Sequence, residues 1–163
     1  MGPLPGPAER AELLHQMEEV PGRLRAAVAG LSNEQLDTPY RPVGWTVRQM
    51  VHHLADADMN WYVRTKLALT QEAPVISPYD EARWAELADA RTQPVEGSLV
   101  LLDGLRRRWA SLFRSLSEEQ WKRTMIHPGR GTLALDMTLA MHAWHGRHHT
   151  AQIQSLRARM NWR

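Results

Sequence analysis

The chain has 163 residues, enough for a single domain (1–163) with its own hydrophobic core. Its 20 Lys and Arg residues nearly balance 18 Asp and Glu residues, and a net charge of +2 argues against a nucleic-acid-binding surface. The absence of cysteine excludes disulfides and thiolate ligands, so a bound metal ion must use histidine, carboxylate or water. No apolar signal segment or run of about 18 apolar residues occurs, so we expect a cytoplasmic protein that does not bind membranes.

Apolar residues at helical spacing predict a first long helix that opens at Pro7 and continues to about Leu31. Pro21 should kink this helix near its middle. Ser32 and Gln35 then form a capping box, the pattern that opens a helical turn. A short turn and a loop are therefore expected before the next long helix.

The start of the second long helix is the clearest signal in the chain. Thr46 and Gln49 form another capping box, and Trp45 and Met50 stand where a hydrophobic staple requires them. The helix should run from this box to about Leu69.

The second helix has one apolar face and a polar line beside it. At about 100° per residue, His52 points nearly opposite the apolar arc and should face water, whereas His53 lies at its edge, beside a groove between helices. Asn60 and Arg64 lie close to His53 on the same wheel. They are either ordinary boundary residues or a pocket wall in which the guanidinium binds a substrate carboxylate.

A long connection, residues 70–92, should contain a short helix with Ser77 as its N-cap. A third long helix opens near Pro94, and its apolar stripe carries no histidine, which indicates packing. We interpret its basic cluster, Arg106–Arg108, as a solvated face.

Another capping box, Ser117 and Gln120, precedes a segment rich in glycine and proline, residues 123–133. That segment predicts a turn or a small hairpin. His127 lies in it and is expected to be exposed rather than a metal ligand.

The last helix is expected from about Leu133 to Arg159, and four of the chain's eight histidines lie within eight of its residues. His148 falls on its predicted core stripe and should be packed. His142 should border, or line, any site that the neighbouring histidines form. The predicted stripe consists of Leu133, Met137, Met141, Trp144 and Ala151.

His145 and His149 stand four apart, so their rings share one helix face. They are either ordinary helix-face histidines or two ligands of one metal ion. An inward His53 on a neighbouring helix favours the metal, since facing helices of a bundle commonly build such sites. Three neutral imidazoles would leave a coordination position open, as in catalytic sites. Imidazole ligands suit Zn, Ni, Cu or Fe.

Two segments, Gly44–Asp56 and Trp144–His149, resemble the DinB/YfiT-like family of metal-dependent hydrolases. Pro78–Glu81 and Lys66–Thr70 are similar to its YfiT branch, which is bacillithiol S-transferase-like. The resemblance implies an all-α fold: a four-helix bundle of up-down-down-up order with short extra helices in the connections. It also implies a homodimer with one divalent metal ion per subunit, which we expect to be Zn or Ni. The ligands implied by position are His53, His145 and His149.

We therefore expect a metal-dependent enzyme, and three hypotheses stay open. The first is a thiol S-transferase that joins a low-molecular-weight thiol such as bacillithiol to an electrophile, with Arg64 and Asn60 holding the acidic end of the thiol. The second is a hydrolase that uses a metal-bound hydroxide, although the spacing places no Asp or Glu beside the metal to act as acid or base. The third is a non-catalytic metal-binding module of a stress response.

Overall fold

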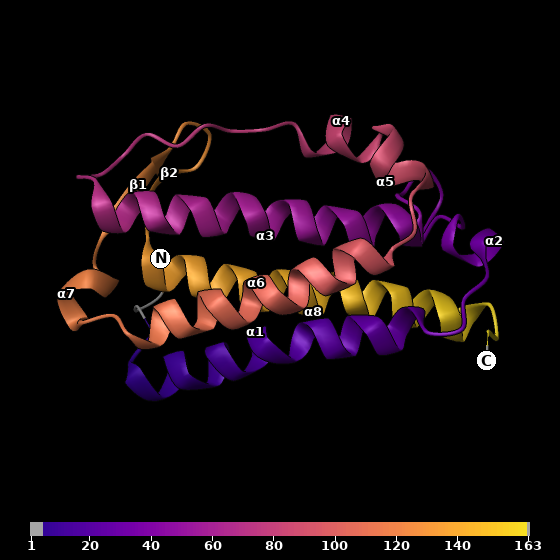
Figure 1. Cartoon of the computed structure of the whole chain (residues 1–163), viewed down its shortest axis with the longest axis horizontal. Helices are drawn as coiled ribbons and strands as arrows, with labels where there is room; N and C mark the ends of the chain where they lie inside the picture. Colours follow the sequence, from indigo (N-terminus) through magenta and orange to yellow (C-terminus); the bar gives the residue numbers. More distant parts are fainter. Residues whose placement is uncertain (1–4, 163) are drawn as a thin grey trace.

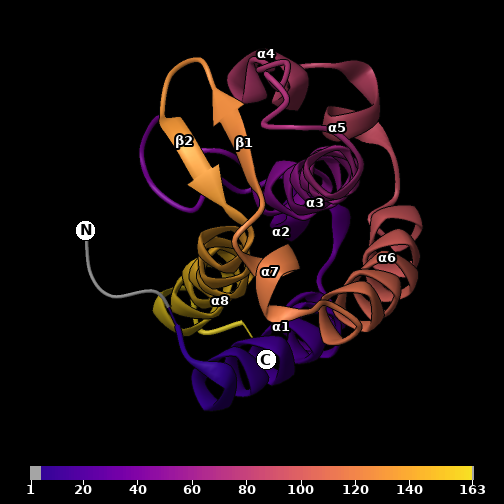
Figure 2. The ribbon, with the colours of Figure 1, turned by 90° about the vertical axis from the view of Figure 1, so that its left-hand side faces the viewer.

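Four long helices form the body of the molecule in the computed structural model, which describes residues 5–162. They are α1 (Pro7–Val28), α3 (Val47–Thr70), α6 (Glu96–Arg114) and α8 (Leu135–Arg159), and they lie side by side (Figure 1). Seen from one end, α1 lies diagonally opposite α3, and α6 opposite α8 (Figure 2). Because α1 and α8 run one way and α3 and α6 the other, the predicted up-down-down-up bundle is confirmed.

Capping boxes open three of the helices, as the sequence predicts: α2 (Asn33–Leu36), α3 and α7 (Glu118–Trp121). At α3, the backbone N–H of Gln49 donates to Thr46 Oγ1 (3.1 Å), and the backbone N–H of Thr46 donates to Gln49 Oε1 (2.9 Å). The side-chain NH₂ group of Gln49 donates to the carbonyl of Ala85 (2.7 Å). The cap therefore also fastens the long connection to the start of α3.

The connection between the parallel helices α3 and α6 crosses the outside of α3 and carries α4 (Glu81–Ala85) and α5 (Ala88–Thr92) (Figure 1). The predicted cap at Ser77 is wrong. Asp80 caps α4 instead, accepting from the backbone N–H of Arg83 (3.0 Å), while the Ser77 carbonyl is held by Arg64 in the segment before the helix.

The predicted hairpin is present as β1 (Thr124–His127) and β2 (Gly131–Ala134), which pair antiparallel. Gly131 has φ +75°, a conformation that other residues adopt only with strain. The backbone of Ile126 exchanges hydrogen bonds with Pro74 and Ile76 of the connection (both 2.9 Å). Hairpin and connection thus lie together over the side of the bundle formed by α3 and α8 (Figure 2).

A buried charged network lies where the four long helices meet. Arg106 on α6 is fully buried, and its guanidinium donates to both carboxylate oxygens of Asp58 on α3 (2.5 and 3.3 Å) and to the Met17 carbonyl on α1 (3.0 Å). His142 on α8 contacts the same carboxylate through Nδ1 (3.1 Å). The predicted solvated face is therefore wrong for Arg106, whose charge is compensated by a residue of another helix.

The buried face of α8 also differs from the predicted stripe. Trp144 is 53% exposed and stacks on the exposed His148, with ring centroids 4.6 Å apart. At Gly146, an added Cβ would lie 2.7 Å from a methyl of Val20, so α1 and α8 approach closely there. The buried residues of α8 are Leu135, Asp136, Thr138, Leu139, His142, Ala143, Gly146, Thr150, Ile153 and Leu156.

His52 does not face water, contrary to its predicted position. Its Nδ1 lies 2.8 Å from Ser98 Oγ, and its Nε2 lies 3.1 Å from the carbonyl of Gln93. The N-terminal part of α6 and the segment before it cover the face of α3 that a single-helix wheel assigns to solvent.

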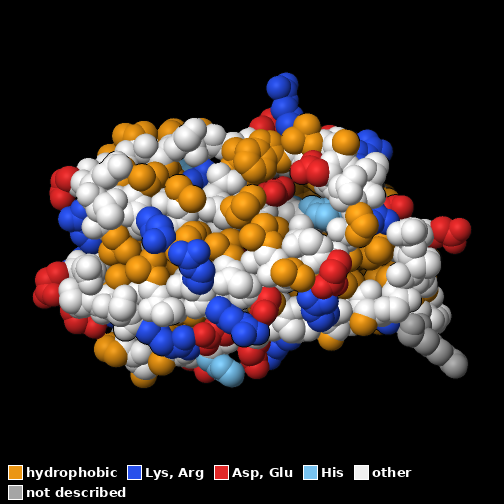
Figure 3. Space-filling view, in the orientation of Figure 1, with side chains coloured by type: hydrophobic (Ala, Val, Ile, Leu, Met, Phe, Trp, Pro, Cys, Tyr) orange, Lys and Arg blue, Asp and Glu red, His pale blue; other side chains and the backbone are white. Residues whose placement is uncertain are grey.

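The surface shows basic and acidic side chains interspersed on the face seen in Figure 3, rather than gathered into a patch of one sign. Within residues 5–162, no helix combines the length and the apolar character needed to cross a membrane.

Candidate metal centre

Three histidines from two helices meet at one point of the bundle. Nε2 of His145 lies 3.1 Å from Nε2 of His53 and 3.1 Å from Nε2 of His149. One ligand atom from each residue lies within 4.8 Å of the other two. A tetrahedral ion with metal–nitrogen bonds of about 2.0 Å holds its ligand nitrogens about 3.3 Å apart. The donor type and the spacing therefore fit a transition-metal ion.

The protonation of the three rings suits a metal ligand, which must be a neutral imidazole. Burial, followed by the neighbouring charge of His149, lowers the pKa of His53 to about 3. Burial and the neighbouring histidines, His142 first among them, lower the pKa of His145 to about 2. Burial lowers the pKa of His149 to about 4, against the hydrogen bond with Gln152. All three are neutral near pH 7.

The outer nitrogen of His149 has a partner of the kind that orients metal ligands. Its Nδ1 lies 2.9 Å from Oε1 of Gln152, which can only accept, so the proton of His149 stands on Nδ1 and Nε2 is left free for an ion. On the other side, the ring of Trp45 covers His53, with centroids 4.5 Å apart, and lies 6.4 Å from His149. The staple residue of α3 is thus also a wall of the histidine cluster.

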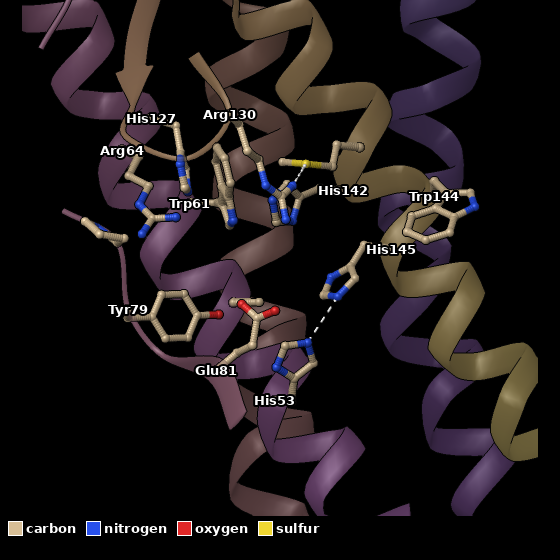
Figure 4. A pocket seen from close by; sticks show the side chains of 13 residues that line it. His53, Trp61, Arg64, Tyr79, Glu81, His127, Arg130, His142, Trp144 and His145 are labelled. Carbon is tan, nitrogen blue, oxygen red and sulfur yellow. Dashed lines mark hydrogen bonds between the residues drawn. The ribbon is translucent and has the colours of Figure 1, made fainter. Parts of the chain in front are cut away.

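A pocket of about 210 Å³ opens beside His53 and His145 and extends along α3 towards the hairpin (Figure 4). Residues of α3, α4, α8, the hairpin and the connection line it. Those with polar or aromatic side chains are His53, Trp61, Arg64, Tyr79, Glu81, His127, Arg130, His142, Trp144 and His145.

Arg64 lies in this pocket and is only 5% exposed. One of its nitrogens donates to the carbonyl of Ser77 (2.6 Å), and its guanidinium lies over the rings of Trp61 (4.8 Å) and Tyr79 (5.6 Å). Burial lowers its pKa, as expected for a charge withdrawn from water.

Among the buried arginines of the described residues, Arg64 differs by having no carboxylate partner. Arg48 pairs with Asp37 (2.7 Å), and Arg106 pairs with Asp58 (2.5 Å). A buried charge is normally compensated by a partner of opposite sign. The pocket therefore presents a cation that has no carboxylate partner, at the end away from His53 and His145.

Further ionisable groups line the pocket, and the sequence had not indicated them. Arg130 and His127, from the hairpin, line it together with Arg64, whereas Glu81 lies nearer to His53 (Figure 4). Burial and the nearby Glu81 raise the pKa of Tyr79 to about 12, so its hydroxyl stays protonated. Tyr79 and Glu81 belong to a segment that carries the family resemblance, which is the one signal that could have singled them out.

Asn60 lies outside this pocket. Its side-chain amide donates to the carbonyl of Asp56 (2.9 Å), and it lines a neighbouring groove that shares Arg64. Asn60 and Arg64 are thus adjacent, but only Arg64 reaches the space beside the histidines.

Comparison with known proteins places the chain in a family. Residues 16–153 match the model of the DinB superfamily. The chain belongs to the DinB superfamily. Relatives from Geobacillus thermodenitrificans and Bacillus cereus are 52% and 51% identical over 93% and 91% of this chain, and over 85% and 86% of their own lengths. Both are named "Putative metal-dependent hydrolase". These relatives confirm the prediction of an enzyme.

Among solved structures, this DinB-superfamily protein is similar to YfiT from Bacillus subtilis, described as a probable metal-dependent hydrolase with an unusual four-helix bundle topology. The two share 45% identity with a TM-score of 0.98, over 100% of this chain and 94% of YfiT. A mycothiol-dependent maleylpyruvate isomerase, 21% identical, shares the fold alone, with a TM-score of 0.69 over 88% of this chain and 60% of that one. The predicted family and bundle topology are thus confirmed.

Proposed function

We propose that this DinB-superfamily protein is a metal-dependent thiol S-transferase whose thiol cosubstrate carries an anionic group. The observation that carries the proposal is the pairing of a three-histidine centre with a buried, uncompensated Arg64 at opposite ends of one pocket. The reaction joins R–SH and an electrophile R′–X into R–S–R′, with release of one proton and X⁻.

His53, His145 and His149 would hold one divalent ion, zinc or nickel in our proposal. The bound ion would supply a Lewis acid that favours the deprotonated form of a thiol or water in contact with it. With no cysteine in the chain, no thiol of the protein competes for that position.

Arg64 would bind the acidic end of the thiol. Its guanidinium is held by the Ser77 carbonyl and by the two aromatic rings, so it is oriented before the substrate arrives. A planar guanidinium can take a carboxylate through two parallel hydrogen bonds. Holding both ends of the substrate fixes the sulfur for attack, which is the positioning contribution to the rate.

The test is a thiol panel with monochlorobimane as the electrophile, using zinc-loaded and nickel-loaded protein. We expect conjugation that requires the metal and is faster with mercaptosuccinate or 3-mercaptopropionate than with 2-mercaptoethanol. An absence of metal-dependent conjugation with any thiol contradicts the proposal.

A hydrolase is the second candidate, and Glu81 favours it. The sequence placed no carboxylate near the three histidines, but Glu81 lines the same pocket and could move a proton to or from an attacking water (Figure 4). Turnover of ester or amide substrates that is lost in both His149→Ala and Glu81→Gln would favour this function over the transferase.

A further inference from the structure

Two buried side-chain nitrogens have no hydrogen-bond partner in the described residues: Nε2 of His142 and Nδ1 of His145. Buried polar atoms are nearly always paired, so each of these needs an explanation. The two residues stand one turn apart on α8 (Figure 4), and their rings lie edge to face, with centroids 5.9 Å apart and planes at 77°.

The proton on His142 is placed by Asp58. Nδ1 of His142 lies 3.1 Å from Oδ1 of Asp58. Burial would raise the pKa of Asp58, but the charge of Arg106 and the hydrogen bond from His142 outweigh it and lower the pKa to about 2. The ionised carboxylate can only accept, so Nδ1 of His142 must donate. A neutral imidazole that donates through Nδ1 has Nε2 as a free acceptor.

The proton on His145 is placed by the metal centre. Its Nε2 is the atom that faces Nε2 of both His53 and His149. A neutral imidazole that binds an ion through Nε2 carries its proton on Nδ1. The unpaired Nδ1 of His145 is therefore a hydrogen-bond donor, and the unpaired Nε2 of His142 is an acceptor.

We propose that His142 is a positioning residue for the metal ligand His145. The two unpaired nitrogens are not hydrogen-bonded to each other, so the Nδ1–H of His145 would donate to one buried water, which would donate in turn to Nε2 of His142. The inference rests on the proposed metal centre. Asp58, His142 and His145 then form one chain of hydrogen bonds that ends at the metal, with His142 between a carboxylate and a ligand.

This series of hydrogen bonds joins the proposed metal centre to the middle of the bundle. Arg106 donates to Asp58 and to the Met17 carbonyl, so the network reaches all four long helices. His149 differs, because its Nδ1 ends on Gln152 of the same helix. The two ligands of α8 are thus held in different ways, one by the core and one locally.

The first test measures zinc affinity of the full-length protein by competition with a chromophoric chelator. His142→Leu removes the acceptor but leaves Asp58 paired with Arg106, so the variant should fold. We expect zinc affinity to fall about 10- to 100-fold, as for other outer partners of metal ligands. His142→Gln can donate to Asp58 and accept from the bridging water, so its zinc affinity should stay within about threefold of that of the unmodified protein.

Thr65→Val is the matched control. Thr65 Oγ1 accepts from Trp109 Nε1 in the same core (3.1 Å) but has no polar link to the metal centre. A general loss of core stability would lower zinc affinity in Thr65→Val as much as in His142→Leu, and that result overturns the inference. Equal affinity of His142→Leu and the unmodified protein overturns it too.

The second test needs no variant. In the zinc-loaded protein with ¹⁵N-labelled histidine, we expect a protonated Nδ1 on both His142 and His145, and on His142 the Nε2 shift of a hydrogen-bonded acceptor. A proton on Nε2 of His142 contradicts the inference. If the unmodified protein binds no transition metal at all, the proposed function itself fails, which is a distinct result.

Discussion

Arg64 illustrates how a single buried charge can indicate a ligand. Removing a guanidinium from water costs free energy. The other buried arginines of the described residues offset this cost by forming an ion pair with a carboxylate. Arg64 has only a carbonyl and two aromatic rings, and it borders the pocket. An anionic ligand would supply the missing partner.

Replacing this arginine should separate anionic from neutral thiols. A hydrogen bond to a charged group contributes about 1.5–3 kcal/mol, so Arg64→Gln should lower kcat/KM about 10- to 100-fold with mercaptosuccinate. The change with 2-mercaptoethanol should stay within about threefold. Arg107→Gln, at an exposed position of α6, is the control and should alter neither value. An equal loss with both thiols would show that Arg64 does not select the anion.

Gln152 contacts His149, one of the three proposed metal ligands. It accepts from Nδ1 of His149 and also contacts Nε2 of the exposed His148 (3.0 Å). Gln152→Leu should weaken zinc binding about tenfold, because the outer partner of a ligand fixes its orientation and proton. Chelator competition measures the effect, with Gln154→Leu, an exposed position two residues further along α8, as the control. Unchanged affinity in Gln152→Leu would mean that the ligand needs no such support.

At the scale of elements, the starts of the helices could be predicted because they are local. A capping box is complete within four residues, and the boxes at Ser32, Thr46 and Ser117 all form as read from the sequence. The hairpin is equally local, since glycine and proline fix its turn. Ser77 shows the limit: the residue suits an N-cap, but its carbonyl is taken by Arg64 from α3, and the helix begins after Asp80.

The faces of the helices could be predicted only where their packing partners are apolar. On α8, Met and Trp residues suggested the core, yet the helix buries His142, Asp136 and two threonines, and Trp144 is exposed. His142 can be buried because Asp58 of α3 meets it, and that pairing is invisible on a wheel of one helix. The same reason explains Arg106 and His52, each satisfied by residues from another segment.

The contact between α1 and α8 gives a stability prediction. Gly146→Ala would put a Cβ 2.7 Å from Val20 Cγ1 and 2.9 Å from Nη1 of Arg106, so the helices must move apart or the buried arginine must shift. We expect a loss of about 1–3 kcal/mol in the free energy of unfolding. Gly104→Ala on α6, where nothing lies within 4 Å, should instead gain about 0.5–1 kcal/mol. Urea denaturation compares them, and equal effects would rule out the close contact.

At the scale of the whole molecule, the cluster of three histidines could be anticipated because the residues stand at positions that a helical wheel and a family motif both mark. The rest of the pocket could not be. Glu81, His127 and Arg130 come from the connection and the hairpin, and only the packing of these two segments across α3 and α8 brings them beside the histidines. The crossover and the hairpin thus supply part of the pocket wall, while two helices of the bundle supply the three clustered histidines.

Metal binding and folding should be coupled through the same histidines. In the metal-free protein, burial lowers the pKa values of His53, His145 and His149 to about 3, 2 and 4. In the unfolded chain they titrate near pH 6.5. Below that pH, the unfolded chain binds protons that the folded protein does not, so stability falls as the pH drops from about 6.5 towards 4. Asp56 acts in the opposite direction, since burial raises its pKa to about 6.

His53→Leu isolates one of these groups, because every other titrating residue is shared with the unmodified protein. Without metal, its free energy of unfolding should decline less steeply with falling pH, by up to about 1.4 kcal/mol per pH unit. At pH 7.5, zinc at a hundred times its dissociation constant should stabilise the unmodified protein by about 2.7 kcal/mol, and a chelator should reverse this. His53→Leu should not respond, since it lacks the ligand from α3. If both proteins show equal pH slopes and an equal zinc response, His53 contributes neither to metal binding nor to the pH dependence of stability.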